Sequence, residues 1–219
     1  MKNKLLRFLS LPAPVSASVY GDYFARLPVL ETPSLVLRPM LLSDAREIFA
    51  YASDPEVARY VLWDPHRSLA ETRSYIRYIR SLYRSGLPSS WAVVFRQTNQ
   101  VIGSIGFMWA SEENRSAEVG YSFSRAFWNR GLATEALSAV LNSAFAALNL
   151  NRIEAQRDIR NPASGRVMEK CGMRQEGVLR GRLLNKGEFI DVALCAILRS
   201  DWECRQALIK NKQIGRTAD

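Results

Sequence analysis

The chain has 219 residues, of which 47% are hydrophobic and 23% are charged, and its formal net charge is +9. This length and composition fit one globular domain with short extensions and exclude an intrinsically disordered chain. No apolar run reaches the ~18 residues that a membrane-spanning helix needs. The segment from Met1 to Leu11 superficially resembles a signal sequence, but Arg7 interrupts its apolar part and Pro12 follows. We therefore interpret it as part of an N-terminal arm.

The cysteines and the histidine restrict the chemistry further. The three cysteines, Cys171, Cys195 and Cys204, are odd in number and are not spaced as metal ligands. His66 is the single histidine, so a zinc site or a histidine-activated nucleophile is hard to build. We therefore expect a reduced, cytoplasmic protein with no metal.

The positive net charge indicates an anionic partner, and three explanations stay open. The partner could be a phosphorylated cofactor or ribosomal and other nucleic-acid surroundings, or the charge could be a basic surface without a specific role. Since the Lys and Arg residues are dispersed along the chain, direct binding of nucleic acid is disfavoured.

Hydrophobic periodicity and cap residues predict a mixed α/β order of elements. A linker-like arm is expected over 1–30, a folded domain over 31–203, and a polar tail over 204–219 that frays after Trp202. In chain order, the predicted elements are a strand over 35–38, a helix over 43–52, a helix or turn over 56–60, a helix over 68–82 capped by Ser68, strands over 91–95, 101–108 and 117–123, a helix over 133–148, a strand over 152–156, a helix over 161–172 capped by Asn161, and strands over 174–184 and 188–198.

The hinge between the strand at 117–123 and the following helix favours an anion site. Unpaired amides at a helix start and the positive end of the helix dipole suit a phosphate or pyrophosphate. Gly131 and Ala133 let a ligand approach the backbone, Thr134 can add a hydroxyl, and Arg130 a cation. The alternative is a plain strand-to-helix turn with small residues, since the run is neither the dinucleotide fingerprint nor a P-loop.

The run Trp128-Asn129-Arg130-Gly131-Leu132-Ala133 resembles the acetyl-CoA loop of the GNAT superfamily of N-acetyltransferases, [QR]-x-x-G-x-[GA]. The match is to the branch that includes the ribosomal-protein N-terminal acetyltransferases. Trp128 stands at the family's Gln/Arg position, and Asn129 replaces the branch's Gly. A second run, from Asn161-Pro162-Ala163-Ser164 to Met173, resembles the branch's N-x-x-S…E-K-x-G-F pattern. The resemblance covers roughly residues 32–202.

The resemblance implies a GNAT-type α/β fold, with a central, mostly antiparallel sheet that splays between its fourth and fifth strands and has helices on both faces. It also implies acetyl-CoA as cosubstrate, with the pantetheine arm inserted into the splay. The residues that it assigns to cofactor binding are Phe123 and Ser124 for main-chain contacts to the pantetheine and acetyl groups, Arg130, Gly131, Leu132, Ala133 and Thr134 for the pyrophosphate, and Asn161 near CoA.

Glu118 is the candidate base, because an amine must be neutral to attack a thioester and an α-amine has a pKa near ~8. Strand alternation places Glu118 on the face of Gly120 and Ser122, while Val119 and Tyr121 point the other way. A lone carboxylate here is either a base or part of a structural ion pair. The resemblance favours the base, acting through a water.

The proton donor to the departing thiolate is a second open question. Many GNAT enzymes use a tyrosine at the position that is Met168 here, so that donor is absent. The ribosomal branch implies Ser164 as the substitute. Cys171, beside the end of that helix, is interpreted as a packing residue.

These observations favour an acetyl-CoA-dependent N-acetyltransferase that acts by direct attack in a ternary complex on the N-terminal α-amine of a protein. The alternatives are a small-molecule amine as acceptor, a non-catalytic acyl-CoA-binding module, and a basic nucleic-acid-binding protein. Proximity to the ribosome is an expectation of the resemblance. The identity of the amine, the choice between monomer and homodimer, and the role of the arm cannot be read from the sequence.

Overall fold

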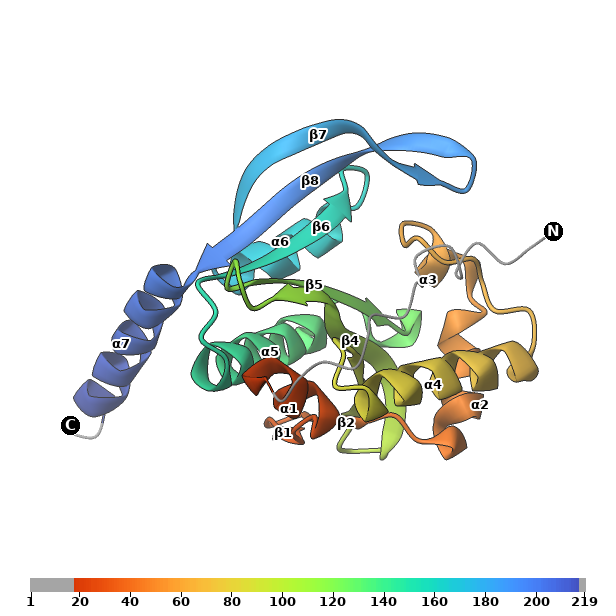
Figure 1. Ribbon diagram of the computed structural model, residues 1–219, viewed down its shortest axis with the longest axis horizontal. Helices are drawn as coiled ribbons and strands as arrows, with labels where there is room; N and C mark the ends of the chain where they lie inside the picture. The colour runs from red at the N-terminus through yellow and green to blue at the C-terminus, as the bar shows by residue number, and fades with distance from the viewer. Residues whose placement is uncertain (1–17, 217–219) are drawn as a thin grey trace.

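The computed structural model describes residues 18–216, so the segment that resembles a signal sequence lies outside it. The described strands form one eight-stranded sheet in the order β1-β2-β3-β4-β5-β6-β8-β7 (Figure 1). Every neighbouring pair is antiparallel except β5 and β6. The strands are β1 (Leu30–Glu31), β2 (Leu35–Pro39), β3 (Ser90–Phe95), β4 (Gln100–Ser111), β5 (Ser116–Phe123), β6 (Arg152–Asp158), β7 (Arg174–Asn185) and β8 (Glu188–Leu198).

Helices cover both faces of the sheet, which confirms the predicted fold class (Figure 1). The alternation in β3 divides the core: Trp91, Val93 and Phe95 pack in the cluster with α1, α5 and α6. Ala92 and Val94 face the opposite cluster, with α2 and α4. The helices are α1 (Val19–Ala25), α2 (Ala45–Ala52), α3 (Pro55–Ala58), α4 (Leu69–Arg84), α5 (Leu132–Ala147), α6 (Pro162–Lys170) and α7 (Arg199–Arg216), with short 3-10 turns η2 (Leu42–Asp44) and η3 (Arg125–Phe127).

The sheet divides between β5 and β6. Backbone pairing joins Ser116–Glu118 to Arg152–Glu154 and then stops, so the two strands diverge beyond this point. A bulge between Phe107 and Trp109 interrupts the register of β4 against β5, and bulges increase the local twist. Counted without the two-residue β1, this is the predicted splay between the fourth and fifth strands.

The part of the N-terminal arm that the structure describes is folded against the core. Helix α1 buries Tyr20 and Phe24, which are 7% and 1% exposed, and the Trp91 Nε1 donates to the Pro28 carbonyl at 2.7 Å. The linker-like interpretation is therefore wrong for this part. A seven-residue helix is marginal alone, but apolar residues four apart give it one face to bury.

The C-terminal tail is more regular than expected, because α7 continues well past Trp202. The Trp202 ring stacks on Phe145 with centroids 5.3 Å apart. The Arg199 guanidinium donates to the carbonyls of Leu148 and Leu150 at 2.9 and 2.7 Å. These contacts fix the first turn of α7 to the end of α5. Beyond Trp202, Arg205 donates to the Lys170 carbonyl at 2.6 Å and Gln206 to Asn142 Oδ1 at 2.9 Å, so the expectation that the chain frays after Trp202 is wrong. No helix within residues 18–216 has the length and apolarity to cross a bilayer.

Candidate active site

The loop between β5 and α5 has the backbone of an anion site. Asn129 and Gly131 adopt left-handed φ angles of 58° and 78°, and the chain then enters α5 at Leu132. Among residues 18–216, none accepts a hydrogen bond from the backbone N–H groups of 129–134. The loop therefore presents unpaired donors at the positive end of a 16-residue helix.

Gly131 meets two requirements of this loop at once. Its positive φ is one that side-chain-bearing residues rarely adopt. No atom lies within 4 Å of the position that a Cβ would take, so a phosphate can approach the backbone there. Ala133 and Thr134 follow in the half-buried first turn, while Leu132 is buried in the core. Leu132, Ala133 and Thr134 would bind an anion through their backbone N–H groups.

Aromatic side chains hold the loop in place. The Arg130 guanidinium carbon lies 5.2 Å from the ring centroids of both Phe95 and Phe127, which keeps a cation beside the exposed amides. The Trp128 indole donates to the Phe123 carbonyl at 2.8 Å. Trp128, at the family's Gln/Arg position, thus connects the loop to the end of β5 through a hydrogen bond.

The edge of β5 that faces the splay offers main-chain groups to an extended ligand. In an antiparallel strand alternate residues direct their N–H and C=O groups away from the bonded neighbour, and β6 pairs with β5 no further than Glu118. At the end of the strand the Ser124 N–H already donates to Ile102 at 2.7 Å, and its carbonyl accepts from Phe127 at 2.9 Å. The free backbone groups therefore lie before Ser124.

A small cleft of about 70 Å³ occupies the split. One wall is β5, another is β6, and α6 and the loop after α3 complete it. Its lining residues are Tyr60, Val61, Val119, Gly120, Tyr121, Gln156, Arg157, Asp158, Asn161, Ser164 and Met168. The cleft reaches from α6 to Gln156, which bonds to Glu118, whereas Glu118 itself does not line it.

Glu118 lies where the backbone pairing of β5 and β6 ends. Its Oε2 accepts from Trp109 Nε1 at 2.7 Å and from Gln156 Nε2 at 3.0 Å. Its Oε1 has no partner within residues 18–216. Burial raises the pKa of the Glu118 carboxyl, while the two hydrogen bonds oppose the rise. One oxygen is therefore anchored and the other is available to accept a proton.

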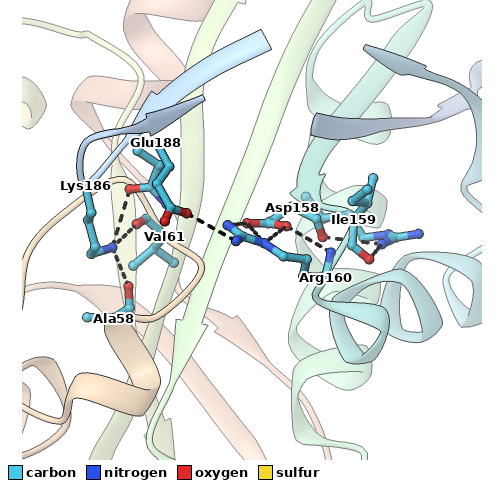
Figure 2. Close-up of polar contacts among 9 residues, drawn as sticks. Ala58, Val61, Asp158, Ile159, Arg160, Lys186 and Glu188 are labelled. Carbon is cyan, nitrogen blue, oxygen red and sulfur yellow. Dashed lines mark hydrogen bonds and ion pairs between the residues drawn. The ribbon is translucent and has the colours of Figure 1, made fainter. Parts of the chain in front are cut away.

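The neighbouring carboxylates differ from Glu118 because each is paired with an arginine. Glu154 accepts from Arg152 at 2.8 Å, and the same guanidinium reaches Glu176 at 2.7 Å. Asp158 and Arg160 are 2.7 Å apart, as Figure 2 shows. No cation lies within ion-pair distance of Glu118 in the described part of the chain. The alternative of a structural ion pair at Glu118 is thereby disfavoured.

Ser164 and Asn161 lie at the start of α6, on the cleft. The Asn161 side chain accepts from the Ser164 amide at 3.2 Å, so it caps the helix as predicted. The Ser164 hydroxyl is 2.9 Å from the Tyr121 hydroxyl, which also donates to the Ser164 carbonyl at 3.1 Å. Burial raises the pKa of Tyr121, so this hydroxyl keeps its proton. Sequence reasoning missed Tyr121, because strand alternation assigned it to the face opposite Glu118.

The tip of the β7–β8 hairpin contacts the loop after α3, which forms one wall of the cleft. The Lys186 Nζ donates to the carbonyls of Ala58 and Val61 at 2.8 and 2.7 Å, which ties the hairpin to the end of α3 and the following loop (Figure 2). Burial lowers the pKa of Lys186. Glu188, on the other strand of the hairpin, pairs with Arg160 at 3.4 Å. Nothing in the sequence signals these contacts.

Other polar candidates are structural. The His66 Nδ1 is 2.9 Å from the Thr72 hydroxyl, and its ring packs against Trp63 and Tyr75. Cys171 is buried, and burial raises the pKa of its thiol, as expected for a packing residue. Among residues 18–216, no group of three His, Cys, Asp or Glu side chains could hold a metal ion.

These features together define a class of enzyme. A helix start with unpaired amides lies at the open end of the split, and a carboxylate with a free oxygen lies at its closed end. The five residue-to-residue steps of extended strand from Glu118 to Phe123 span roughly 16 Å. The arrangement suits a phosphorylated thioester held in extended form beside a base, which is the site of a CoA-dependent acyltransferase.

The comparisons with known proteins give the family. Residues 34–174 match the acetyltransferase (GNAT) domain, and the chain belongs to this family of acetyl-CoA-dependent N-acetyltransferases. It is 35% identical over 176 residues to the uncharacterized N-acetyltransferase p20 of Bacillus licheniformis, over 80% of this chain and 99% of that protein. It is 25% identical to the spermidine N(1)-acetyltransferase of Vibrio cholerae, over 77% of this chain and 95% of that one.

Solved structures of the same family share the fold. The crystal structure of a GNAT-family acetyltransferase from Bacillus anthracis superposes with a TM-score of 0.71 and is 28% identical. The match covers 79% of this chain and 99% of that chain. The predicted family, fold and acetyl-CoA cosubstrate are confirmed.

Proposed function

We propose that this enzyme transfers the acetyl group of acetyl-CoA to the N-terminal α-amine of a protein, by direct attack in a ternary complex. The observation that carries the proposal is the free Oε1 of Glu118 at the closed end of the split, anchored through Oε2. In this proposal Glu118 takes the proton from the attacking amine, directly or through one water.

Donor binding in the proposal uses the β5–α5 loop and the free edge of β5. The backbone amides of Gly131, Leu132, Ala133 and Thr134, with Arg130 beside them, would hold the diphosphate. Main-chain groups of β5 up to Phe123 would align the pantetheine arm, with Asn161 on the far wall. The Ser124 backbone, whose N–H and carbonyl are already bonded, would contribute only by holding the end of the strand. The unpaired amides and the open space over Gly131 support this assignment.

The chemical step then requires little from the protein beyond positioning and proton transfer. The amine lone pair attacks the thioester carbonyl, the C–N bond forms, and the C–S bond breaks with release of a thiolate. The nitrogen, cationic after attack, loses its second proton to solvent, which leaves the neutral amide. Ser164 is the proposed donor of a proton to that thiolate. The Tyr121 hydroxyl, 2.9 Å from the Ser164 hydroxyl, would hold Ser164 in place, and solvent would return the proton to Ser164.

Charge around the cleft supports an acceptor with a single amino group. Glu154 and Asp158 are both paired with arginines. A polyamine would therefore find one unpaired carboxylate, Glu118, and no second one on β6 for its other ammonium groups. Arg182 also acts electrostatically on Glu118, which favours a neutral or acidic chain behind the amine. We extend the proposal to a cytoplasmic enzyme near the ribosome, monomeric or homodimeric.

A small-molecule amine is the second candidate, and the spermidine N(1)-acetyltransferase relative is the observation that favours it. Purified enzyme should be assayed with acetyl-CoA against peptides that match cytosolic protein N-termini, against polyamines and against amino acids. Mass spectrometry of cellular N-termini, with and without the gene, would name a protein substrate. Turnover confined to small amines would contradict the first candidate. No turnover with any amine, despite acetyl-CoA binding, would indicate a non-catalytic module.

A further inference from the structure

We infer that Gln156 is a positioning residue for the reaction, and this inference rests on the function proposed above. Its amide nitrogen holds the Glu118 carboxylate. Its amide oxygen accepts a hydrogen bond from the attacking amine, directly or through one water. Glu118 and Gln156 thus form a two-point acceptor for one nitrogen atom.

The orientation of the Gln156 amide is determined by its neighbour. An ionised carboxylate can only accept hydrogen bonds, so the group 3.0 Å from Glu118 Oε2 is the Gln156 NH2. The amide oxygen then points elsewhere. It is buried and has no partner within residues 18–216. Buried acceptors are nearly always bonded, so an orphaned one implies a donor that arrives with solvent or ligand.

The cleft is where such a donor would come from. Gln156 lines the cleft between β5 and β6, two residues beyond the last backbone pair of β6 with β5. The contact of Gln156 with Glu118 is thus a side-chain bridge between two strands that have already begun to separate. Each member of the bridge retains one unpaired oxygen, Oε1 in both cases.

The chemistry of a primary amine matches two acceptors. The incoming ammonium has three protons, of which one goes to Glu118 Oε1. The neutral amine keeps two N–H groups and a lone pair. If one N–H is held by the Gln156 oxygen, the lone pair can be directed at the thioester carbon. Trp109 fixes Glu118 Oε2 from the β4 side at 2.7 Å, so the carboxylate cannot rotate away from this arrangement.

Three charged or donor groups besides Gln156 influence the titration of Glu118. Trp109 lowers its pKa through a hydrogen bond, Glu154 on β6 raises it, and Arg182 on β7 lowers it. Removal of the Gln156 amide takes away another hydrogen bond that lowers the pKa. The pH dependence of the rate therefore reports the bond between Gln156 and Glu118, whereas the loss of kcat/KM at a pH where Glu118 is fully ionised reports the bond of the Gln156 oxygen to the amine.

The test compares Gln156→Leu and Gln156→Glu with the matched control Gln175→Leu, whose side chain accepts from Arg157 at 3.1 Å and does not line the cleft. We expect Gln156→Leu to lose roughly 10–100-fold in kcat/KM for the amine, with a KM for acetyl-CoA within about twofold of wild type. The acidic limb of its pH–rate profile should move to higher pH, so its deficit grows as pH falls.

Gln156→Glu should show the opposite trend. The introduced carboxyl group, when protonated, reproduces both the donor and the acceptor of the amide, whereas its ionised form faces Glu118 with a like charge. The deficit of this variant should therefore grow as pH rises. This variant also keeps the inference testable if Gln156→Leu does not fold.

The outcomes separate this inference from the proposed function. If the wild-type enzyme acetylates no amine in the panel, the proposed function fails. If it is active, and the Gln156 variants match Gln175→Leu in kcat/KM and in pH profile, the role of Gln156 is refuted while the proposed function stands. Acetyl-CoA affinity by calorimetry verifies that each variant is folded.

Discussion

Substitution of Glu118 by Gln is the sharpest test of the proposed chemistry, because it removes the base and little else. The oxygen of the introduced carboxamide can still accept from Trp109 and Gln156, as Oε2 of Glu118 does at 2.7 and 3.0 Å. The carboxamide NH2 then takes the place of Oε1 and cannot accept a proton. The split and the β5–α5 loop should keep their geometry.

The expected loss follows from the role of that oxygen. A positioned general base contributes roughly 10²–10⁴ in rate, or about 2.7–5.4 kcal/mol at 1.36 kcal/mol per decade. At pH 7 only about a tenth of an α-amine with pKa ~8 is neutral, so the base is needed most there. Above pH ~8 the amine deprotonates unaided, and the deficit of Glu118→Gln should shrink severalfold.

The wild-type enzyme should have an acidic limb in its pH–rate profile. Glu118 acts as a base only when ionised, and burial raises its pKa above the ordinary value of 4.5. The rate should therefore fall as pH drops through that raised pKa, and this limb should be absent in Glu118→Gln.

The assay follows release of the CoA thiol with a disulfide reagent, from pH 5 to 9, with a blank that lacks amine because Cys204 is an exposed thiol. Acetyl-CoA affinity is measured in parallel by calorimetry and should change by less than about twofold. Wild-type kcat in Glu118→Gln at pH 7 would refute the assignment of the base. Loss of acetyl-CoA affinity would show that the substitution disturbs the donor site instead.

Three further substitutions test the donor loop, the arm and the hairpin. Gly131→Ala places a Cβ at φ 78°, which costs about 1–2 kcal/mol. Because the free loop would relax away from this conformation and acetyl-CoA would have to restore it, acetyl-CoA should bind roughly 5–30-fold more weakly by calorimetry. The matched control is Gly187→Ala, at φ 93° in the hairpin turn, which should bind acetyl-CoA normally. Phe24→Ala should destabilise the fold by about 3–5 kcal/mol and lower Tm by roughly 6–20 °C, and an unchanged Tm would refute the role of α1 in the core. Lys186→Met removes both bonds to the loop after α3, so the KM of the amine should rise severalfold while that of acetyl-CoA stays constant; equal changes in both would contradict a role confined to the acceptor side.

The sequence predicted what depends on local pattern. The helical stripe in α5, the caps Ser68 and Asn161, and the alternation at the start of β5 all involve residues close in the chain, and the structure confirms them. The donor loop was predictable for the same reason, since its unpaired amides follow from one strand-to-helix junction.

The acceptor side was not predictable, because it depends on contacts between distant segments. Gln156 bonds to Glu118, which is 38 residues away in the sequence, and Lys186 bonds to Ala58, which is 128 residues away. Tyr121 was assigned away from the site by alternation alone, although both sides of β5 border the cleft once the strands part. Helix α1 was missed because seven residues give too short a periodicity to detect without the surface that they cover.

The Lys186 contact has a consequence for how such enzymes diversify. In the proposed site, the donor half is encoded by one continuous stretch of chain, whereas the acceptor half is assembled from strand β6 and a connecting loop that the hairpin tip holds. Insertions or substitutions at the tip can therefore reshape amine selectivity while leaving cofactor recognition intact. A lineage of homologues can in this way acquire new acceptors without rebuilding its catalytic scaffold.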